Sequence, residues 1–269
     1  MGFFELALLE ALLLGALCGV VGTIVVLRRR AFFTTALTHA TYPGGVAAAI
    51  LGLDIVAGAA VASVGLVLIM TVLGRVRRQG PQVAAGIVLT SGFALGTMLQ
   101  SLNPSLPVQA DTFLVGSILT VSVTDIVLTG VVLVVAVAAV ALVGKELLFS
   151  TFDPSGFRAA GFRPGSIDLL ALGLIAATVV VAMPAVGSIL SISLIVAPAA
   201  AARLVTDSVS RMLPVAVVVG IASGVLGLLA SRAFSVAAGG AITLVAAGFF
   251  VLALIVSQVL GRSRVRARA

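Results

Sequence analysis

Long runs without a charged side chain constrain this chain more than any other feature. Between Asp168 and Arg203 lie 34 uncharged residues, and residues 79–110 carry no charge. Hydrophobic residues make up 61% of the chain and charged residues 9%, against about 25% charged in soluble domains. Each run can form a helix across about 30 Å of hydrocarbon and exceeds a barrel strand of about 10 residues. We expect an all-α, polytopic membrane protein; a soluble enzyme, a disordered chain and a nucleic-acid-binding domain are excluded.

The charges between the runs predict about nine transmembrane helices, or eight if one pair has merged. The expected spans are 4–27, 31–53, 55–74, 82–102, 124–144, two within 169–202, 213–231 and 241–260. The residues between Asp111 and Asp125 are too few to cross, so a short surface or re-entrant helix is expected over 112–122. These two aspartates are candidates for an outer gate. Glycines spaced by four residues should let helices approach closely: Gly15 and Gly19, Gly92 and Gly96, Gly220 and Gly224.

The basic residues predict the orientation, because cytoplasmic loops are enriched in Lys and Arg. With the N-terminus outside, nine spans place 15 of the 16 basic residues in the cytoplasm and leave only Arg232 outside. The C-terminus is then cytoplasmic, and residues 262–269 form a basic tail. Residues 1–269 form one transmembrane domain, in which 145–166 are the longest cytoplasmic loop.

His39 is the only histidine, and it lies inside the second expected span. Thr35 shares its helix face, Thr38 and Thr41 lie beside it, and Pro43 with two glycines should loosen the helix just after it. Otherwise the spans are almost free of ionisable groups, which argues against an intramembrane enzyme. The stripe favours a substrate pathway; the alternative is a histidine that hydrogen bonds a neighbouring helix for packing.

Four stretches, in order along the chain, resemble motifs of one family of membrane proteins. They are Arg30-Ala31-Phe32-Phe33 through His39 to Gly44, the region from Asp111 to Asp125 with Val115-Gly116-Ser117-Ile118-Leu119, residues 152–161, and residues 186–203. The chain is similar to the permeases of ABC importers of the zinc, manganese and iron type. Together the four stretches cover almost the whole chain.

The resemblance implies a subunit of the prokaryotic plasma membrane that is not itself an enzyme. It would form a homodimer with a second permease copy in the lipid, and bind two cytoplasmic ABC ATPases and an external metal-binding protein. No permanent cofactor is implied. The transported ion would pass a weak site at His39 and Thr35. The ATPase-coupling residues would be Phe152, Asp153, Pro154, Phe157 and Gly161. Asp153 is placed to cap a short helix that starts at Pro154 and ends near Gly161.

Two positions depart from the family pattern. Thr35 stands where the family has an aspartate four residues before the histidine, and Ser155 where it has a glutamate. Imidazole suits Zn²⁺ and carboxylates suit Mn²⁺, so zinc is expected first and manganese next. Three alternatives stay open: a permease for cobalamin or iron chelates, an ion-coupled secondary carrier, and a membrane scaffold that transports nothing.

Overall fold

The computed structural model describes residues 2–73, 81–104 and 116–266, and this part of the chain is helical without any β-strand. The helices are α1 (Phe3–Leu27), α2 (Ala31–Ala40), α3 (Tyr42–Ile50), α4 (Ile55–Leu73), α5 (Pro81–Ser101), the 3₁₀ turn η1 (Ile118–Thr120), α7 (Val123–Phe152), α8 (Pro154–Ala159), α9 (Pro164–Val186), α10 (Ser188–Val205), α11 (Val209–Phe234) and α12 (Ala238–Arg266). The expected all-α fold is confirmed.

Seven described helices are long and apolar enough to cross a membrane: α1, α4, α5, α7, α9, α11 and α12. Two expected spans are built differently. The span expected over 31–53 is a broken pair, α2 and α3, with Thr41 between them. The 34-residue uncharged run turns at Gly187, whose φ of 83° suits a residue without a Cβ. The second half of the run forms α10, whose apolar part, Leu190–Val205, is shorter than the seven helices named above.

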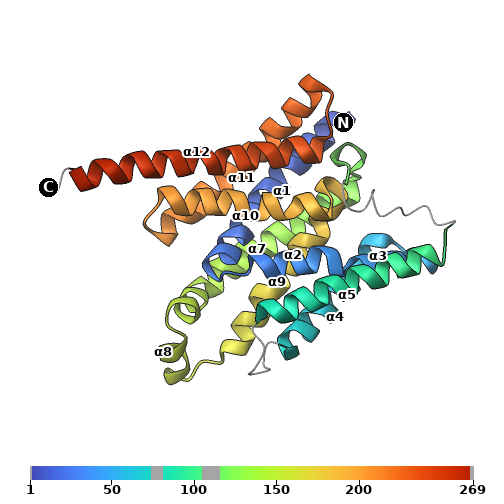
Figure 1. The fold of residues 1–269 in the computed structure, drawn as a ribbon, viewed down its shortest axis with the longest axis horizontal. Helices are drawn as coiled ribbons and strands as arrows, with labels where there is room; N and C mark the ends of the chain where they lie inside the picture. The colour runs from blue at the N-terminus through green and yellow to red at the C-terminus, as the bar shows by residue number, and fades with distance from the viewer. Residues whose placement is uncertain (1, 74–80, 105–115, 267–269) are drawn as a thin grey trace.

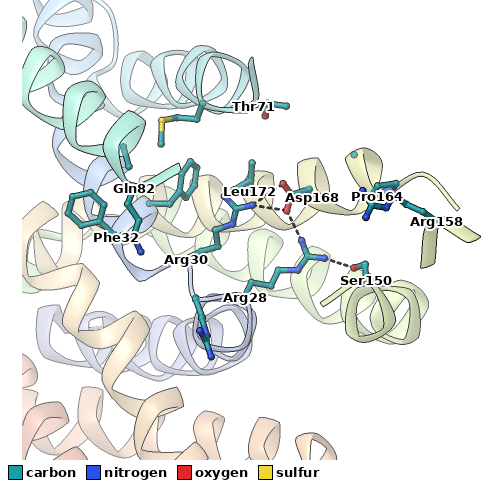
Figure 2. A pocket seen from close by; sticks show the side chains of 15 residues that line it. Arg28, Arg30, Phe32, Thr71, Gln82, Ser150, Arg158, Pro164, Asp168 and Leu172 are labelled. Carbon is teal, nitrogen blue, oxygen red and sulfur yellow. Dashed lines mark hydrogen bonds and ion pairs between the residues drawn. The ribbon is translucent and has the colours of Figure 1, made fainter. Parts of the chain in front are cut away.

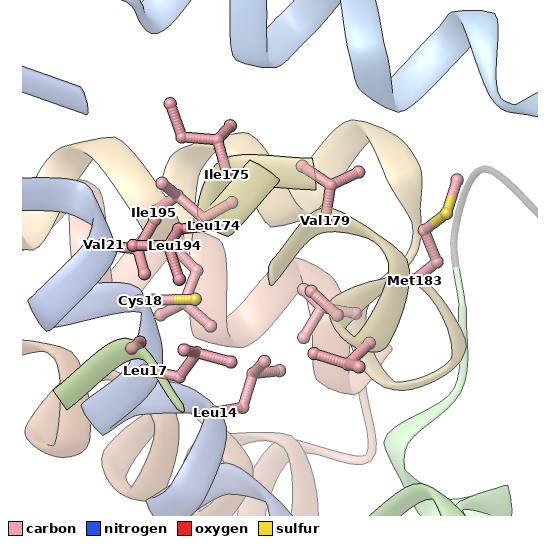
Figure 3. Packing of buried hydrophobic residues seen from close by; sticks show 14 of the residues in the cluster. Leu14, Leu17, Cys18, Val21, Leu174, Ile175, Val179, Met183, Leu194 and Ile195 are labelled. Carbon is pink, nitrogen blue, oxygen red and sulfur yellow. The ribbon is translucent and has the colours of Figure 1, made fainter. Parts of the chain in front are cut away.

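Helices α1, α9, α10 and α11 form a tightly packed unit, which we call the frame (Figure 1). Figure 3 shows its interior, where Leu17 and Cys18 of α1 meet Ile175 of α9 and Ile195 of α10. Helix α11 lies so close to α1 that a Cβ on Gly15 would stand 2.5 Å from the carbonyl oxygen of Gly220. The close approach expected from the spaced glycines is therefore confirmed here.

Helices α2–α5 form a second unit, which we call the arm, beside the frame (Figure 1). Gly92 of α5 faces Ala40, where an added Cβ would lie 2.7 Å from the Cα atom, and Gly96 faces the Tyr42 ring. Large apolar side chains such as Val61 on α4, Val134 on α7 and Leu244 on α12 are exposed. These outer surfaces suit lipid or another protein, not water.

Between α5 and α7 the structure describes residues 102–104 and 116–122, so Asp111 lies outside the described residues. The short element expected over 112–122 is represented there by η1, with Ile118 buried. The Ser117 amide donates to the Pro184 carbonyl at 3.0 Å. An added Cβ on Gly116 would collide with the backbone at Gly187. Two of the family-like stretches therefore meet at one end of the bundle.

Candidate metal pathway

The break between α2 and α3 lies where the sequence predicts a loosened helix. Pro43 has no amide hydrogen to donate to the preceding turn. The chain is held across the break by bonds from the Gly44 and Gly45 amides to the Thr41 carbonyl, at 3.0 and 3.3 Å. The interruption is therefore a single residue, Thr41, beside His39, and it lies inside an otherwise apolar bundle.

The threonines of α2 surround His39 as its spacing suggested. Thr34, Thr38 and Thr41 are fully buried, while His39 and Thr35 are half-buried. The Thr38 hydroxyl lies 3.0 Å from His39 Nδ1 and donates to the Thr35 carbonyl at 2.8 Å. Across the arm, the His39 ring faces Phe93 of α5 with the centroids 6.0 Å apart. Its Nε2 makes no hydrogen bond to any described residue, so that nitrogen is available to a ligand.

The thioether of Met183, which is a soft metal ligand, lies near the break. The Thr41 hydroxyl lies 3.8 Å from Met183 Sδ of α9. The described residues contain no group of three His, Cys, Asp or Glu side chains able to hold a metal ion. One imidazole with a nearby hydroxyl fits brief contact with a passing ion better than a resident metal, because an ion in transit must also leave.

At the end of the bundle that holds α8, residues of the arm and the frame line an open cavity of about 780 Å³ (Figure 2). Phe32 and Phe33 of α2 line it, together with Met70 of α4, Gln82 of α5 and Leu172 of α9. Phe32 precedes His39 by seven residues, about 10 Å along a helix. His39 and Thr35 are not among the described residues that line the cavity, so the polar stripe of α2 and the cavity are separate features.

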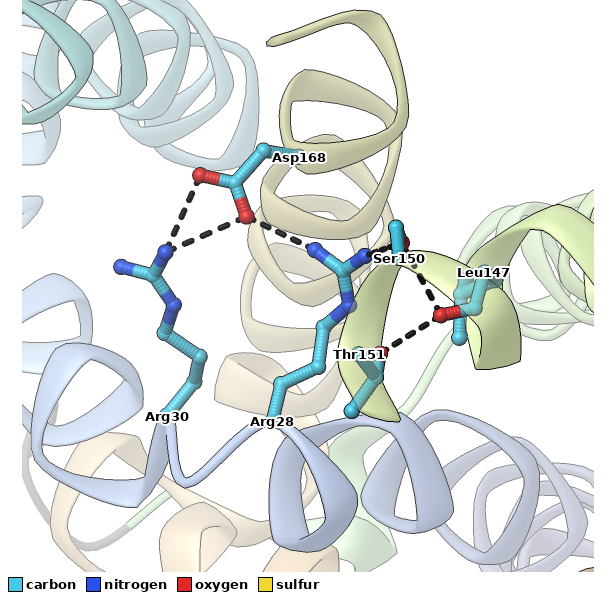
Figure 4. Close-up of polar contacts among 6 residues, drawn as sticks. All are labelled: Arg28, Arg30, Leu147, Ser150, Thr151 and Asp168. Carbon is cyan, nitrogen blue, oxygen red and sulfur yellow. Dashed lines mark hydrogen bonds and ion pairs between the residues drawn. The ribbon is translucent and has the colours of Figure 1, made fainter. Parts of the chain in front are cut away.

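A polar network at this cavity joins the turn between α1 and α2 to α9 and α7 (Figure 4). Asp168 of α9 accepts from Arg28 at 2.7 Å and from Arg30 at 3.0 Å, and Arg28 also donates to Ser150 of α7 at 2.6 Å. The network was not predictable from the sequence, because its members are separated by up to 140 residues along the chain. The only signal was a lone carboxylate at the start of an apolar run.

The loop over 145–166 contains the short helix that the sequence predicts. Asp153 Oδ1 accepts from the Gly156 amide at 2.8 Å, and Pro154 is the first residue of α8. These hydrogen bonds, from the Gly156 amide first and the Ser155 hydroxyl second, hold the pKa of Asp153 below its ordinary value. Gly161, with φ of 84°, follows the helix as expected. Its amide bonds to the Arg158 carbonyl, and that of Phe162 to the Phe157 carbonyl.

The Phe157 side chain lies inside its own loop and not on the loop's exposed surface. Its side chain is 1% exposed and packs against Phe162, at a centroid distance of 4.9 Å, and against Phe149, at 5.4 Å. Its own loop therefore already buries Phe157, and the ATPase-coupling role of this residue stays a prediction. The most exposed aromatic side chains of the loop are Phe152 and Phe162, at 63% and 49%, followed by Phe149 at 38%.

At the opposite end, Asp125 has a structural partner. Its carboxylate accepts from the Ser122 amide at 2.9 Å and from the Ser122 hydroxyl at 2.6 Å, which forms a capping box at the start of α7. Nearby, the buried Glu10 of α1 accepts from the Thr129 hydroxyl at 2.8 Å. Capping accounts for the Asp125 position, and the gate role stays a prediction.

Known proteins are similar to almost the whole length of this chain. Residues 1–257 match the ABC 3 transport family. The manganese transport system membrane protein MntC of Halalkalibacterium halodurans is 33% identical over 255 residues, covering 95% of this chain and 87% of that protein. The chelated iron transport system membrane protein YfeD of Yersinia pestis is 31% identical over 257 residues, covering 96% and 86%. A chain of PsaBC from Streptococcus pneumoniae, solved in complex with a Fab, superposes with a TM-score of 0.84 and 32% identity, covering 94% and 91%.

The fold and the site define a class: a polytopic helical membrane protein with a broken polar helix against a rigid apolar unit. Broken helices inside membrane proteins are typical of transporters. The chain belongs to the ABC 3 transport family, as the resemblance of its four motifs indicated, and is a multi-pass protein of the plasma membrane.

Proposed function

We propose that this chain is the permease subunit of an ATP-driven importer and that a divalent transition metal ion crosses the membrane along α2 and α3. The interrupted helix carries the proposal, because it places His39, with an available Nε2, beside buried threonine hydroxyls inside an otherwise apolar bundle. Relatives named for manganese and chelated iron transport match nearly the whole chain, which supports the same class of cargo.

The proposed topology has nine crossings, with α2 and α3 counted as one broken span and α10 as another. Its N-terminus is outside and its C-terminus cytoplasmic. The clustering of Arg28, Arg30, Arg158 and Arg203 around cavities at one end supports this orientation. Arg232 lies at the other end, with its guanidinium 4.5 Å from the Phe4 ring centroid.

Orientation can be tested with single cysteines in a Cys18→Ala background. Leu53 is exposed between α3 and α4, and Ser155 is exposed in α8. An impermeant maleimide added to intact cells should label Leu53→Cys and leave Ser155→Cys unlabelled until the cells are opened. The reverse pattern would contradict the orientation.

The proposed partners follow from the two ends of the bundle. ATP would be hydrolysed by a pair of separate cytoplasmic ATPases that dock on α8 and its exposed neighbours Phe152 and Phe162. An external metal-binding protein would deliver the ion at the end near Asp125. A second copy of this chain would complete the transporter, within the lipid, through part of the exposed apolar surface of the outer helices.

Two ions compete as the cargo. The imidazole of His39 and the hydroxyl of Thr35 favour Zn²⁺, because carboxylate ligands suited to Mn²⁺ are absent from the described part of α2. Manganese is the second candidate, favoured by the relative named for manganese transport.

The test is uptake into proteoliposomes that hold this chain with its ATPase and binding protein. We expect ATP-dependent uptake of radioactive zinc or manganese, with the other ion as the weaker competitor. Uptake driven by an ion gradient without ATP would instead identify a secondary carrier. ATP-dependent uptake of cobalamin or an iron chelate, without free metal, would contradict the cargo class.

A further inference from the structure

Five arginines surround two adjoining cavities at the end of the bundle that holds α8. The larger cavity, about 780 Å³, is lined by Arg28, Arg29, Arg30 and Arg158, and the smaller, about 380 Å³, by the first three and Arg203. We call them together the basic pocket. Among the described residues, Asp168 is the only carboxylate that lines either cavity. The described lining therefore carries a large excess of positive charge.

The excess is partly enclosed, so water does not fully screen it. The Arg28 side chain is 8% exposed, and its Nε is buried without a hydrogen-bond partner among the described residues. Arg28 and Arg30 share the single carboxylate of Asp168, whose side chain is 38% exposed. A buried cation of this kind is stabilised by a further anion that also satisfies its remaining donors.

We propose that the basic pocket binds a phosphate-class anion. Guanidinium groups present planar pairs of N–H donors that match phosphate oxygens, and phosphate forms strong charge-assisted hydrogen bonds with them. The cavity volume lies within the range of sites that hold a small molecule. The site is separate from the proposed metal contact at His39, and it has the wrong charge to hold a metal cation.

Two sources could supply this chemistry. One is the headgroup of an anionic phospholipid of the inner leaflet, since basic pockets between transmembrane helices on the cytoplasmic side bind such headgroups. The other is a soluble phosphate. Both present the same oxygens to the arginines.

The test uses the purified full chain in detergent, stripped of lipid, and does not depend on transport. Inorganic phosphate is titrated and followed by phosphorus NMR. Retention of phosphatidylglycerol is compared with that of phosphatidylcholine by native mass spectrometry.

Arg30→Gln should weaken binding by about tenfold, the effect of one charge-assisted hydrogen bond. Asp168→Asn should tighten it by about threefold, since a competing surface carboxylate is removed. Arg211→Gln, an exposed position outside both cavities, should change nothing.

The outcomes separate the sources and the alternatives. Saturable phosphate binding without selective lipid retention supports a soluble anion, and the reverse supports a lipid headgroup. Absence of both would overturn the proposal and leave the arginines to an acidic surface of another protein. Equal weakening by Arg30→Gln and Asp168→Asn would also overturn it, because a purely structural ion network predicts that pattern.

Discussion

The frame and the arm both bring helices together at glycines, but they differ in the continuity and the polarity of their helices. In the frame, glycines bring α1 and α11 into backbone contact, and apolar side chains such as Leu17 and Ile195 fill the remaining space. In the arm, the central element is broken at Thr41 and carries a polar face that includes Thr35 and His39. Burial differs as well: 72% of the apolar segment is buried in α1 and α9 and 39% in α11, against 17% in α4 and α5.

We infer that the frame and the arm have different roles. Backbone contact between unbroken helices leaves no room for small shifts, since packed interiors respond to added volume with strain. In the arm, the interruption at Thr41 adds a point at which α2 and α3 can bend, because Pro43 cannot donate a backbone hydrogen bond there. We infer that the frame keeps its form while α2 and α3 rearrange around the ion.

The largest expected effect is on the stability of the frame. Gly15→Ala places a Cβ 2.5 Å from the Gly220 carbonyl oxygen, where only backbone could yield. We expect a loss of about 3 kcal/mol, the upper end for overpacking, seen as a lower unfolding temperature in detergent. The matched control is Gly173→Ala on α9, where an added Cβ meets nothing within 4 Å. It should be neutral or stabilising by up to about 1 kcal/mol. Equal effects at both sites would contradict the rigid frame.

Next in size is the coupling loop. Phe157→Asp puts a carboxylate among Phe149 and Phe162, which should cost about 2 kcal/mol and unfold α8 locally. Phe152→Asp changes an exposed side chain and should keep α8 folded while weakening ATPase docking. Limited proteolysis reports the loop, and metal-stimulated ATP hydrolysis reports coupling. Full ATP hydrolysis and uptake in both variants would remove the coupling role.

A smaller effect is expected from restoring a carboxylate in the arm. Thr35→Asp adds a ligand that suits Mn²⁺ on the His39 face of α2. Competition assays should show a shift towards manganese of about tenfold, equivalent to roughly 1.4 kcal/mol. Thr35→Asn adds a similar volume without the charge and should leave the preference near that of the wild type. An unchanged preference in Thr35→Asp would place the ion elsewhere.

The smallest effect is expected at the cap of α8. The pKa of Asp153 is lowered in the folded protein, so its ionised form stabilises α8 above the ordinary pKa of 3.8. This contribution is lost as the pH falls through the lower folded value. At neutral pH, Asp153→Ala should speed hydrogen exchange of the Gly156 amide, and Asp153→Asn should largely preserve it, because Asn also caps helices. Equal exchange in all three proteins would show that the cap is dispensable.

Local features were predictable from the sequence because they depend on neighbours along the chain. The break after His39 follows from Pro43, the cap of α8 follows from Asp153 and Pro154, and the close helix contacts follow from glycine spacing. Each needs only the covalent properties of a few adjacent residues.

Long-range pairs were not predictable in the same way. Nothing local assigns Asp168 to Arg28, Thr129 to Glu10 or Gly116 to Gly187. Hydropathy also failed to show that Phe157 packs inside its own loop, because an aromatic residue in a polar segment fits an internal core and an external partner equally well.

The central claim, that the arm carries the ion past His39, is tested most directly by one substitution. His39→Gln keeps the size and hydrogen-bonding capacity of the side chain but removes the imidazole that binds metal. In proteoliposomes with ATPase and binding protein present, the account predicts that His39→Gln folds normally and slows zinc and manganese uptake by more than about tenfold, as expected when more than roughly 1.4 kcal/mol of interaction is lost. A well-folded His39→Gln protein that moves both ions at the wild-type rate would contradict it.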